Sequence, residues 1–152
     1  MKSILIILLS ISFITKSFCQ SSTDFYNQGY QKSISGDLEG AVKFYNTAID
    51  MSPTYSKAIL ARGACFNILM NNEKDINAKA IYYVLCLKDF DKYISLNVTD
   101  SKGYVLRANS NMTWYASSKK IEFKDKACAD WQLAKSLGDN QAQIFASKYC
   151  QK

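Results

Sequence analysis

The side chains best suited to chemistry in this chain are carboxylates that lie close together in the sequence. Asp89 and Asp91 form one pair, Asp125 and Asp130 form another, and paired carboxylates act as acid and base in glycosidases. Both pairs lie among lysines, however, at spacings typical of a solvated helix face. The chain contains no histidine, which excludes serine–histidine and cysteine–histidine nucleophile systems. The sequence therefore predicts a protein that is not an enzyme.

Metal, cofactor and nucleic-acid sites also lack support. The five cysteines form no CxxC pair and no glycine-rich phosphate loop is present, so we expect neither a metal nor a cofactor. The densest basic cluster, Lys119, Lys120, Lys124 and Lys126, is interpreted as a solvated turn. Acidic residues are interspersed with the basic ones throughout. The formal net charge of +6 therefore does not indicate a nucleic-acid partner.

The first residues have the composition of a secretory signal. Lys2 supplies the basic residue that precedes the apolar segment of a signal peptide. Residues 4–14 form that segment, which is too short to predict a membrane span. We predict a signal peptide at residues 1–19, cleaved near Cys19/Gln20, and hence an exported protein, periplasmic or secreted. Lipidation of Cys19, as in bacterial lipoproteins, is the alternative. No other apolar run is long enough to predict a membrane span.

Residues 25–53 carry the most informative pattern in the chain. Small and aromatic residues recur at helical spacing and end in a proline: Phe25, Gln28, Gly29, Ala41, Tyr45, Ala48 and Pro53. This pattern resembles one tetratricopeptide repeat (TPR) unit, a pair of antiparallel helices with a period of 34 residues. Gly29 and Ala41 suit the seam because small side chains let two helix backbones approach. Asp37 predicts the start of the second helix, and Pro53 marks where it has stopped.

A second copy of the pattern follows at the expected distance. Gly63 lies 34 residues after Gly29, with Phe66 after it and Phe90 in the second half of the unit. The second half lies about eleven residues further along the chain than in the first copy, so we expect an insertion within residues 69–80. Residues 71–75 are polar enough for a loop, and residues 76–87 are apolar enough to extend the second helix backwards.

A third copy and a cap complete the predicted fold. The third copy runs from Tyr104 to Gly138 with a connecting turn at residues 117–126, and the last helix carries Ile144, Phe145 and Tyr149. We therefore predict an all-α domain over residues 20–152, a short right-handed α-solenoid of three TPR-like helix pairs. The units fall at about 22–55, 56–100 and 101–140, and a capping helix at 141–150 covers the last apolar face.

Export would favour disulfides among the four cysteines that remain after cleavage: Cys65, Cys86, Cys128 and Cys150. Four cysteines allow three connectivities. In the repeat alignment Cys65 and Cys86 lie on facing helices of the second unit, and Cys150 ends the helix that packs back on Cys128. We predict Cys65–Cys86 and Cys128–Cys150, with four buried unpaired thiols as the alternative. The segment from residue 126 to Cys150 also resembles the end of exported bacterial TPR proteins, in which a short cap ends in cysteine.

The predicted fold places a binding surface on its concave face. In stacked repeats the first helices of successive units line that face and form a groove. Their outward side chains are the predicted partner-binding residues, a mixture of aromatic, aliphatic and amide groups that suits a peptide or a partner helix: Tyr26, Tyr30, Ser33, Leu60, Ala64, Asn67, Ile68, Lys102, Val105, Asn109 and Met112. The alternative for the two tyrosines is that they cap the open end of the stack.

The family resemblance also implies one partner class that these residues do not suit. Some TPR cochaperones bind a C-terminal carboxylate through basic and amide side chains on three successive first helices. In this chain Tyr26, Tyr30, Ala61 and Leu106 hold the corresponding places, and only Lys102 has a suitable charge. We therefore do not expect a receptor for chaperone tails.

Two classes of function follow from the sequence. The first is an adaptor that binds a protein or peptide in the groove. The second is a structural module of a cell-envelope or secreted assembly, which should expose an apolar patch near residues 76–85 and self-associate. An exported effector or inhibitor with one target is a weaker third alternative.

Overall fold

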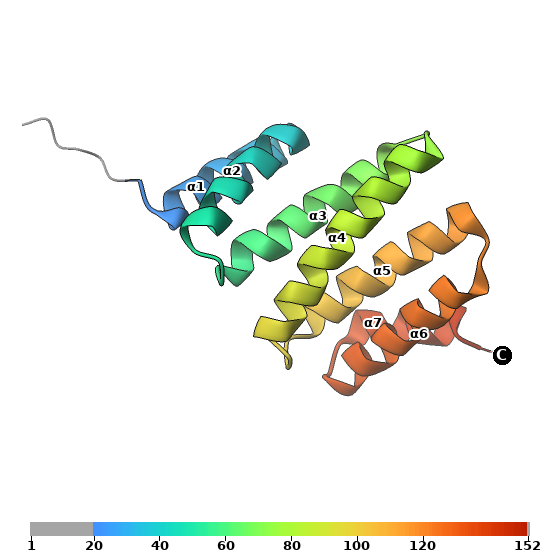
Figure 1. Ribbon diagram of the computed structural model, residues 1–152. Helices are drawn as coiled ribbons and strands as arrows, with labels where there is room; N and C mark the ends of the chain where they lie inside the picture. The colour runs from blue at the N-terminus through green and yellow to red at the C-terminus, as the bar shows by residue number, and fades with distance from the viewer. Residues whose placement is uncertain (1–19, 152) are drawn as a thin grey trace, which may run out of the picture.

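The computed structural model describes residues 20–151, and these form seven α-helices joined by short turns. Figure 1 shows three helix pairs stacked side by side, with a last helix beside α6. The helices are α1 (Ser22–Ile34), α2 (Leu38–Met51), α3 (Ser56–Asn72), α4 (Ile76–Leu96), α5 (Ser101–Ser118), α6 (Ile121–Ser136) and α7 (Asn140–Tyr149). The prediction of an all-α stack of three pairs and a capping helix is confirmed. The predicted signal peptide, including Cys19, lies outside the described residues.

The contacts between helices show which layer lies on the inside of the stack. Each of α1–α2, α3–α4 and α5–α6 packs most closely within its own pair. Between pairs, α1 also contacts α3 and α3 also contacts α5, whereas the second helices do not approach one another to the same extent. Helices α1, α3 and α5 therefore form the inner, concave layer, and α2, α4 and α6 form the outer layer.

The first pair forms where the sequence signals predict. Helix α1 begins with a capping box, because Ser21 accepts from the Asp24 backbone and Asp24 accepts from the Ser21 backbone at 2.8 Å. Asp37 caps α2 by accepting from the Gly40 N–H at 2.9 Å, as predicted. Helix α2 ends at Met51, two residues before Pro53.

Glycines at the seams of the first two pairs let the helices approach closely. A Cβ on Gly29 would lie 2.7 Å from Cε1 of Tyr45, and a Cβ on Gly63 would lie 2.8 Å from Cε1 of Phe90. Both distances are too short for real side chains. The aromatic rings of the second helices therefore occupy the space that a glycine leaves, as the repeat pattern implies.

The insertion in the second unit lengthens both of its helices. Helix α3 has 17 residues and α4 has 21, and only residues 73–75 separate them. The predicted start of α4 at Ile76 is confirmed. The added turns make new contacts, since Tyr82 stacks on Phe66 of α3 with ring centroids 6.4 Å apart and Tyr83 stacks on Trp114 of α5 at 5.0 Å.

The predicted connecting turn at residues 117–126 is wrong in extent. Helix α5 continues to Ser118, and α6 already begins at Ile121. Lys119 ends α5 in the left-handed conformation with φ of 59°. The polar residues that suggested a turn lie on the exposed face of α6, while Phe123 between them packs edge-on against Tyr83.

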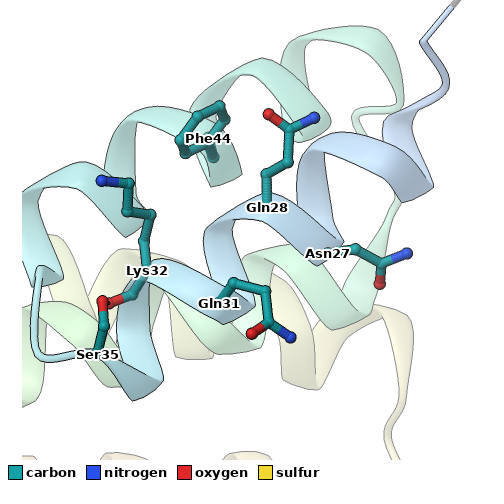
Figure 2. A pocket seen from close by; sticks show the side chains of 6 residues that line it. All are labelled: Asn27, Gln28, Gln31, Lys32, Ser35 and Phe44. Atoms are coloured by element: carbon teal, nitrogen blue, oxygen red, sulfur yellow. The ribbon is translucent and has the colours of Figure 1, made fainter.

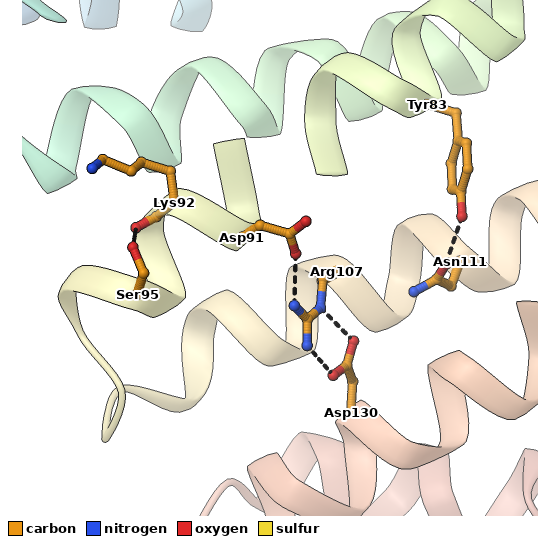
Figure 3. Close-up of polar contacts among 7 residues, drawn as sticks. All are labelled: Tyr83, Asp91, Lys92, Ser95, Arg107, Asn111 and Asp130. Carbon is orange, nitrogen blue, oxygen red and sulfur yellow. Dashed lines mark hydrogen bonds and ion pairs between the residues drawn. The ribbon is translucent and has the colours of Figure 1, made fainter. Parts of the chain in front are cut away.

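Two arginines join successive helix pairs by the same geometry. Arg62 of α3 donates to both carboxylate oxygens of Asp89 in α4, and its Nη1 donates to Asn46 of the preceding pair at 2.7 Å. Arg107 of α5 likewise donates to both oxygens of Asp130 in α6. Its Nη1 donates to Asp91 of the preceding pair at 2.6 Å, as Figure 3 shows. We call these two sets the arginine bridges.

The arginine bridges correct the sequence interpretation of two carboxylates. Asp89 and Asp130 were assigned to a solvated helix face, but both are buried, at 3% and 7% exposure. Their bidentate pairing with arginine makes that burial tolerable. The side chain of Asp91, by contrast, is 59% exposed. Spacing along one helix does not show a partner on a different helix, and so the sequence did not reveal these pairs.

The structure contains one of the two predicted disulfides. Cys128 and Cys150 are bonded, as predicted, and the bond closes a sequence separation of 22 residues. Closing a loop of this size stabilises the folded chain by about 3 kcal/mol in the chain-entropy model. The bond ties α6 to the C-terminal end of α7, where Cys150 is the capping residue.

The predicted Cys65–Cys86 bond is wrong, because both thiols are free and buried. Cys65 packs toward the first helix pair, in the cluster that contains Ala41 and Tyr45. Cys86 is fully buried on α4, where its Sγ contacts the carbonyl oxygen of Tyr83 at 3.1 Å. The two residues occupy facing helices, but Cys65 is directed toward the preceding pair. The two thiols therefore serve as small core side chains.

The free thiols should resist chemical modification in the folded protein. Burial raises the pKa of both Cys65 and Cys86 to about 11, so little thiolate forms at neutral pH and reagent access is blocked. We expect both residues to remain unlabelled by iodoacetamide in native buffer and to be labelled fully in denaturant without reductant. Mass-spectrometric peptide mapping measures this. A Cys65–Cys86 cross-linked peptide in a non-reduced digest would contradict it.

Candidate functional site

The concave layer carries the predicted partner-binding residues with very different degrees of exposure. Tyr30 and Ile68 are the exposed apolar side chains among them, at 49% and 47%. Lys102 is also exposed, and Leu60, Ala64 and Val105 are half-buried. Tyr26 packs mainly against other rings, with centroids 5.8 Å from Tyr45 and 5.5 Å from Tyr55. The assignment of these side chains to a partner stays a prediction.

Three of the predicted polar groups already have partners within the protein. Asn67 is buried, and its Nδ2 donates to Ser110 Oγ of α5 at 2.8 Å. Ser33 Oγ donates to the carbonyl oxygen of Tyr30 at 2.9 Å. Asn109 Oδ1 accepts from the indole N–H of Trp131 at 3.2 Å. Asn67 therefore fastens α3 to α5, and the open surface of the groove is more apolar than its sequence suggests.

Beside the groove, a cavity of about 300 Å³ lies where α5, α6 and α7 meet. Two of the predicted residues, Asn109 and Met112, lie in its wall. The other residues of the wall are not among the predicted partner-binding residues: Thr113, Ala116, Trp131, Phe145 and Tyr149. The aromatic spacing in residues 145–149 was visible, but it was interpreted only as the apolar face of a cap. We call this cavity the cap pocket.

The cap pocket has the composition of a site for an apolar side chain. Phe145 and Tyr149 of α7 lie over Trp131, with ring centroids 5.3 and 5.8 Å from the indole. Within the described residues, the Nδ2 group of Asn109 makes no hydrogen bond, so it remains a donor for a backbone carbonyl. Small-molecule and side-chain pockets combine mostly apolar walls with a few polar groups in this way. Thr113 and Tyr149 supply the hydroxyl groups of the wall, and its lining residues include no carboxylate, lysine, histidine or cysteine.

A larger hollow of about 530 Å³ lies at the N-terminal end of the stack. Figure 2 shows Phe44 of α2 beside Gln28 and Lys32 of α1. Gln28 and Phe44 hold the places that Arg62 and Asp89 hold in the second pair. Because neither Gln28 nor Phe44 is charged, no arginine bridge forms in the first pair. The polar side chains let this end of the stack face water.

The outer layer exposes one apolar surface on α4. Ile81 and Val84 are each 62% exposed and Ile76 is 49% exposed. A cavity of about 330 Å³ is lined there by Ala80, Ile81, Val84 and Leu85. This is the patch near residues 76–85 that the structural-module alternative requires. Across residues 20–151, no helix combines the length and the hydropathy that crossing a bilayer requires.

Comparison with known proteins identifies the fold. No protein-family model and no curated protein sequence matches this chain. Among solved structures, the first TPR domain of Spaghetti (RPAP3), bound to the HSP90 peptide SRMEEVD, superposes with a TM-score of 0.69 at 15% identity over 86% of this chain and 91% of that chain. The TPR domain of Arabidopsis OM64 gives a TM-score of 0.67 at 18% identity over 84% and 93%. The chain has the fold of a TPR domain.

The same fold recurs in further TPR proteins at similarly low identity. The first TPR domain of human RPAP3 superposes with a TM-score of 0.67 at 14% identity, over 85% of this chain and 89% of that chain. These matches cover nearly all of the described residues, so the three pairs and the cap are all part of the shared fold. At this identity the likeness shows the fold alone.

Proposed function

We propose that this chain is an exported, non-catalytic protein-interaction scaffold that binds an extended peptide or a partner helix along α1, α3 and α5. The cap pocket is the observation that carries the proposal. It joins the groove residues Asn109 and Met112 to an aromatic wall at one end of the concave layer. An apolar side chain of the partner is the group that such a wall binds best.

The composition of the groove selects the chemistry of the partner. The TPR domain of Spaghetti is bound to the peptide SRMEEVD, in which three of the last four residues are acidic. In this chain Tyr26, Tyr30, Ala61 and Leu106 stand where the family resemblance implies polar or basic groups, so we infer a partner with aromatic or large aliphatic anchors. The exposed Tyr30 and Ile68 supply apolar contacts along the groove.

Two observations support export. The segment before Gln20 has the pattern of a signal peptide. The Cys128–Cys150 bond is also the kind of bond that persists in oxidising compartments. The periplasm or the exterior of the cell is therefore the proposed location, and a lipid anchor on Cys19 is the alternative to a freely exported chain.

The proposal predicts different effects for two isoleucines of the second helix pair. Ile68 of α3 faces the concave layer and Ile81 of α4 faces outward, and both are exposed, so a charge at either costs little stability. Peptides are first selected against the wild-type protein from a display library. We expect Ile68→Glu to weaken binding of a selected peptide at least about 10-fold in calorimetry, because a buried contact is lost and a charge is desolvated.

The matched control is Ile81→Glu, which should leave the affinity within about 2-fold of the wild type. The reverse pattern, in which Ile81→Glu abolishes binding and Ile68→Glu does not, would place the working surface on α4. That result would favour the second candidate function, a structural module that assembles through the apolar surface of the outer layer.

A further inference from the structure

Helix α7 is held to the stack at both of its ends. At its start, Asp139 caps the helix by accepting from the Ala142 N–H at 2.8 Å, and it also accepts from Ser101 Oγ of α5 at 3.0 Å. At its end, Cys150 is bonded to Cys128 of α6. Gly138, in the turn before α7, has φ of 88°, and the backbone N–H groups of Gly138 and Asp139 donate to the carbonyl oxygens of Lys135 and Ala134, so this turn is fixed as well.

Between these two ends the packing of α7 is thin. Its two buried residues are Ala142 and Ala146, whose side chains are single methyl groups. Phe145 is half-buried, whereas Ile144 is 57% exposed and Tyr149 is 37% exposed. Burial of apolar area is what holds one helix on another. The disulfide is therefore a large share of what keeps the end of α7 in place.

The position of α7 decides whether the cap pocket exists. Phe145 and Tyr149 form one side of the pocket and cover Trp131, which is only 2% exposed. Figure 1 shows α7 beside α6 at the end of the stack, with no further helix of the described chain over it. Movement of α7 away from α6 would remove that side of the pocket and expose the indole to water.

The two residues of this bond differ from the free cysteines in their exposure to solvent. Cys128 and Cys150 are both partly exposed, whereas Cys65 and Cys86 are buried. We therefore expect a reductant in solution to reach the bond that holds α7 while α1–α4 stay folded.

We propose that the Cys128–Cys150 bond is a redox latch that holds α7 closed over Trp131 and so keeps the cap pocket formed. A dithiol, small or carried by an oxidoreductase, supplies the two electrons and two protons. One of its thiolates attacks a sulfur of the bond to form a mixed disulfide, and its second thiol displaces the protein sulfur. Cys128 and Cys150 are left as thiols, and the dithiol becomes a disulfide.

The latch regulates the site described above, and this part of the inference rests on the proposed function. With the bond formed, the pocket is ready for an apolar side chain of the partner. With the bond reduced, the C-terminal end of α7 is released from α6, and the partner loses the contacts to Phe145 and Tyr149. The affinity for the partner then depends on the reduction potential of the thiol–disulfide couples in the compartment.

The test uses the purified protein before and after treatment with dithiothreitol. Hydrogen exchange measured by mass spectrometry follows residues 140–150, and acrylamide quenching follows Trp131 in a Trp114→Phe variant, where it is the single indole. On reduction we expect exchange in α7 to become faster on the order of 100-fold and Trp131 to become accessible, while α1–α4 keep their protection. The Cys128→Ser/Cys150→Ser variant should behave as the reduced protein with or without dithiothreitol.

Two results would overturn the latch. One is unchanged exchange in α7 and unchanged quenching of Trp131 after the bond is shown to be reduced. The other is a loss of protection across α1–α4 as well, because the bond would then stabilise the whole fold. A selected peptide should bind the reduced protein at least about 10-fold more weakly, and equal binding while α7 is open overturns the regulation. Failure of every peptide to bind the oxidised protein counts against the proposed function, while the exchange and quenching results still decide the latch.

Discussion

Replacing Arg107 with leucine is expected to lower the free energy of unfolding by about 3–5 kcal/mol, the range for breaking a buried ion pair by removing one partner. The change leaves Asp130 buried without its two hydrogen bonds, and it also unpairs Asp91 of the preceding pair. The hydrogen bonds that Arg107 donates to these carboxylates, to Asp130 above all, raise the pKa of its side chain above the ordinary value, so the arginine is fully charged in the fold. Urea denaturation followed by far-ultraviolet circular dichroism measures the loss.

A double variant separates the buried charge from the lost contact. Arg107→Leu/Asp130→Leu removes both charges, and we expect it to recover most of the stability because no unpaired carboxylate remains buried. Lys32→Ala is the control, since it breaks an exposed ion pair with Asp37 whose side chains are 48% and 44% exposed. That change should cost no more than about 1 kcal/mol. If Lys32→Ala and Arg107→Leu lowered the free energy of unfolding equally, the arginine bridges would not be what holds successive helix pairs together.

Replacing Trp131 with alanine is expected to cost about 3–5 kcal/mol of unfolding free energy, the range for truncating a fully buried large aromatic side chain. The indole lies in the cluster that contains Tyr104 and Ala108, and it supports both aromatic rings of α7. Its loss therefore leaves a cavity at the junction of α5, α6 and α7. The same denaturation measurement applies, and hydrogen exchange should show the largest change in α7.

Trp131→Phe is the matched variant for this prediction. It keeps an aromatic ring in the cluster but removes the hydrogen bond to Asn109, so the expected loss is about 1–2 kcal/mol. A Trp131→Ala protein whose unfolding free energy falls by less than about 1 kcal/mol would contradict the account of the cluster around Trp131, and with it the structural basis of the cap pocket.

The elements that the sequence predicted correctly are those specified by local signals or by the repeat period. Gly29 and Gly63 lie 34 residues apart, and at both the neighbouring ring fills the place of a side chain. Asp37 and Pro53 act within one turn of a helix end, so their effect does not depend on the rest of the fold. The eleven extra residues became helix because residues 76–87 are apolar.

The predictions that failed depend on the direction of a side chain between helices. Cys65 and Cys86 lie on facing helices, but the rotation of α3 directs Cys65 toward the first pair. The repeat alignment also placed Asn67 on the open surface, whereas it bonds to Ser110 across the seam of α3 and α5. The cap pocket was missed because its walls come from three helices, and only α5 was treated as part of the groove.

The central claim, that a partner binds the concave layer, is tested most directly by methyl NMR of the protein with and without a selected peptide. Methyl groups of Leu60, Ile68 and Met112 report on the concave layer, and those of Ile76, Ile81 and Val84 report on the outer surface of α4. We predict that the peptide shifts the first set and leaves the second unchanged. Shifts confined to Ile76, Ile81 and Val84 would contradict the claim and would assign binding to the outer layer.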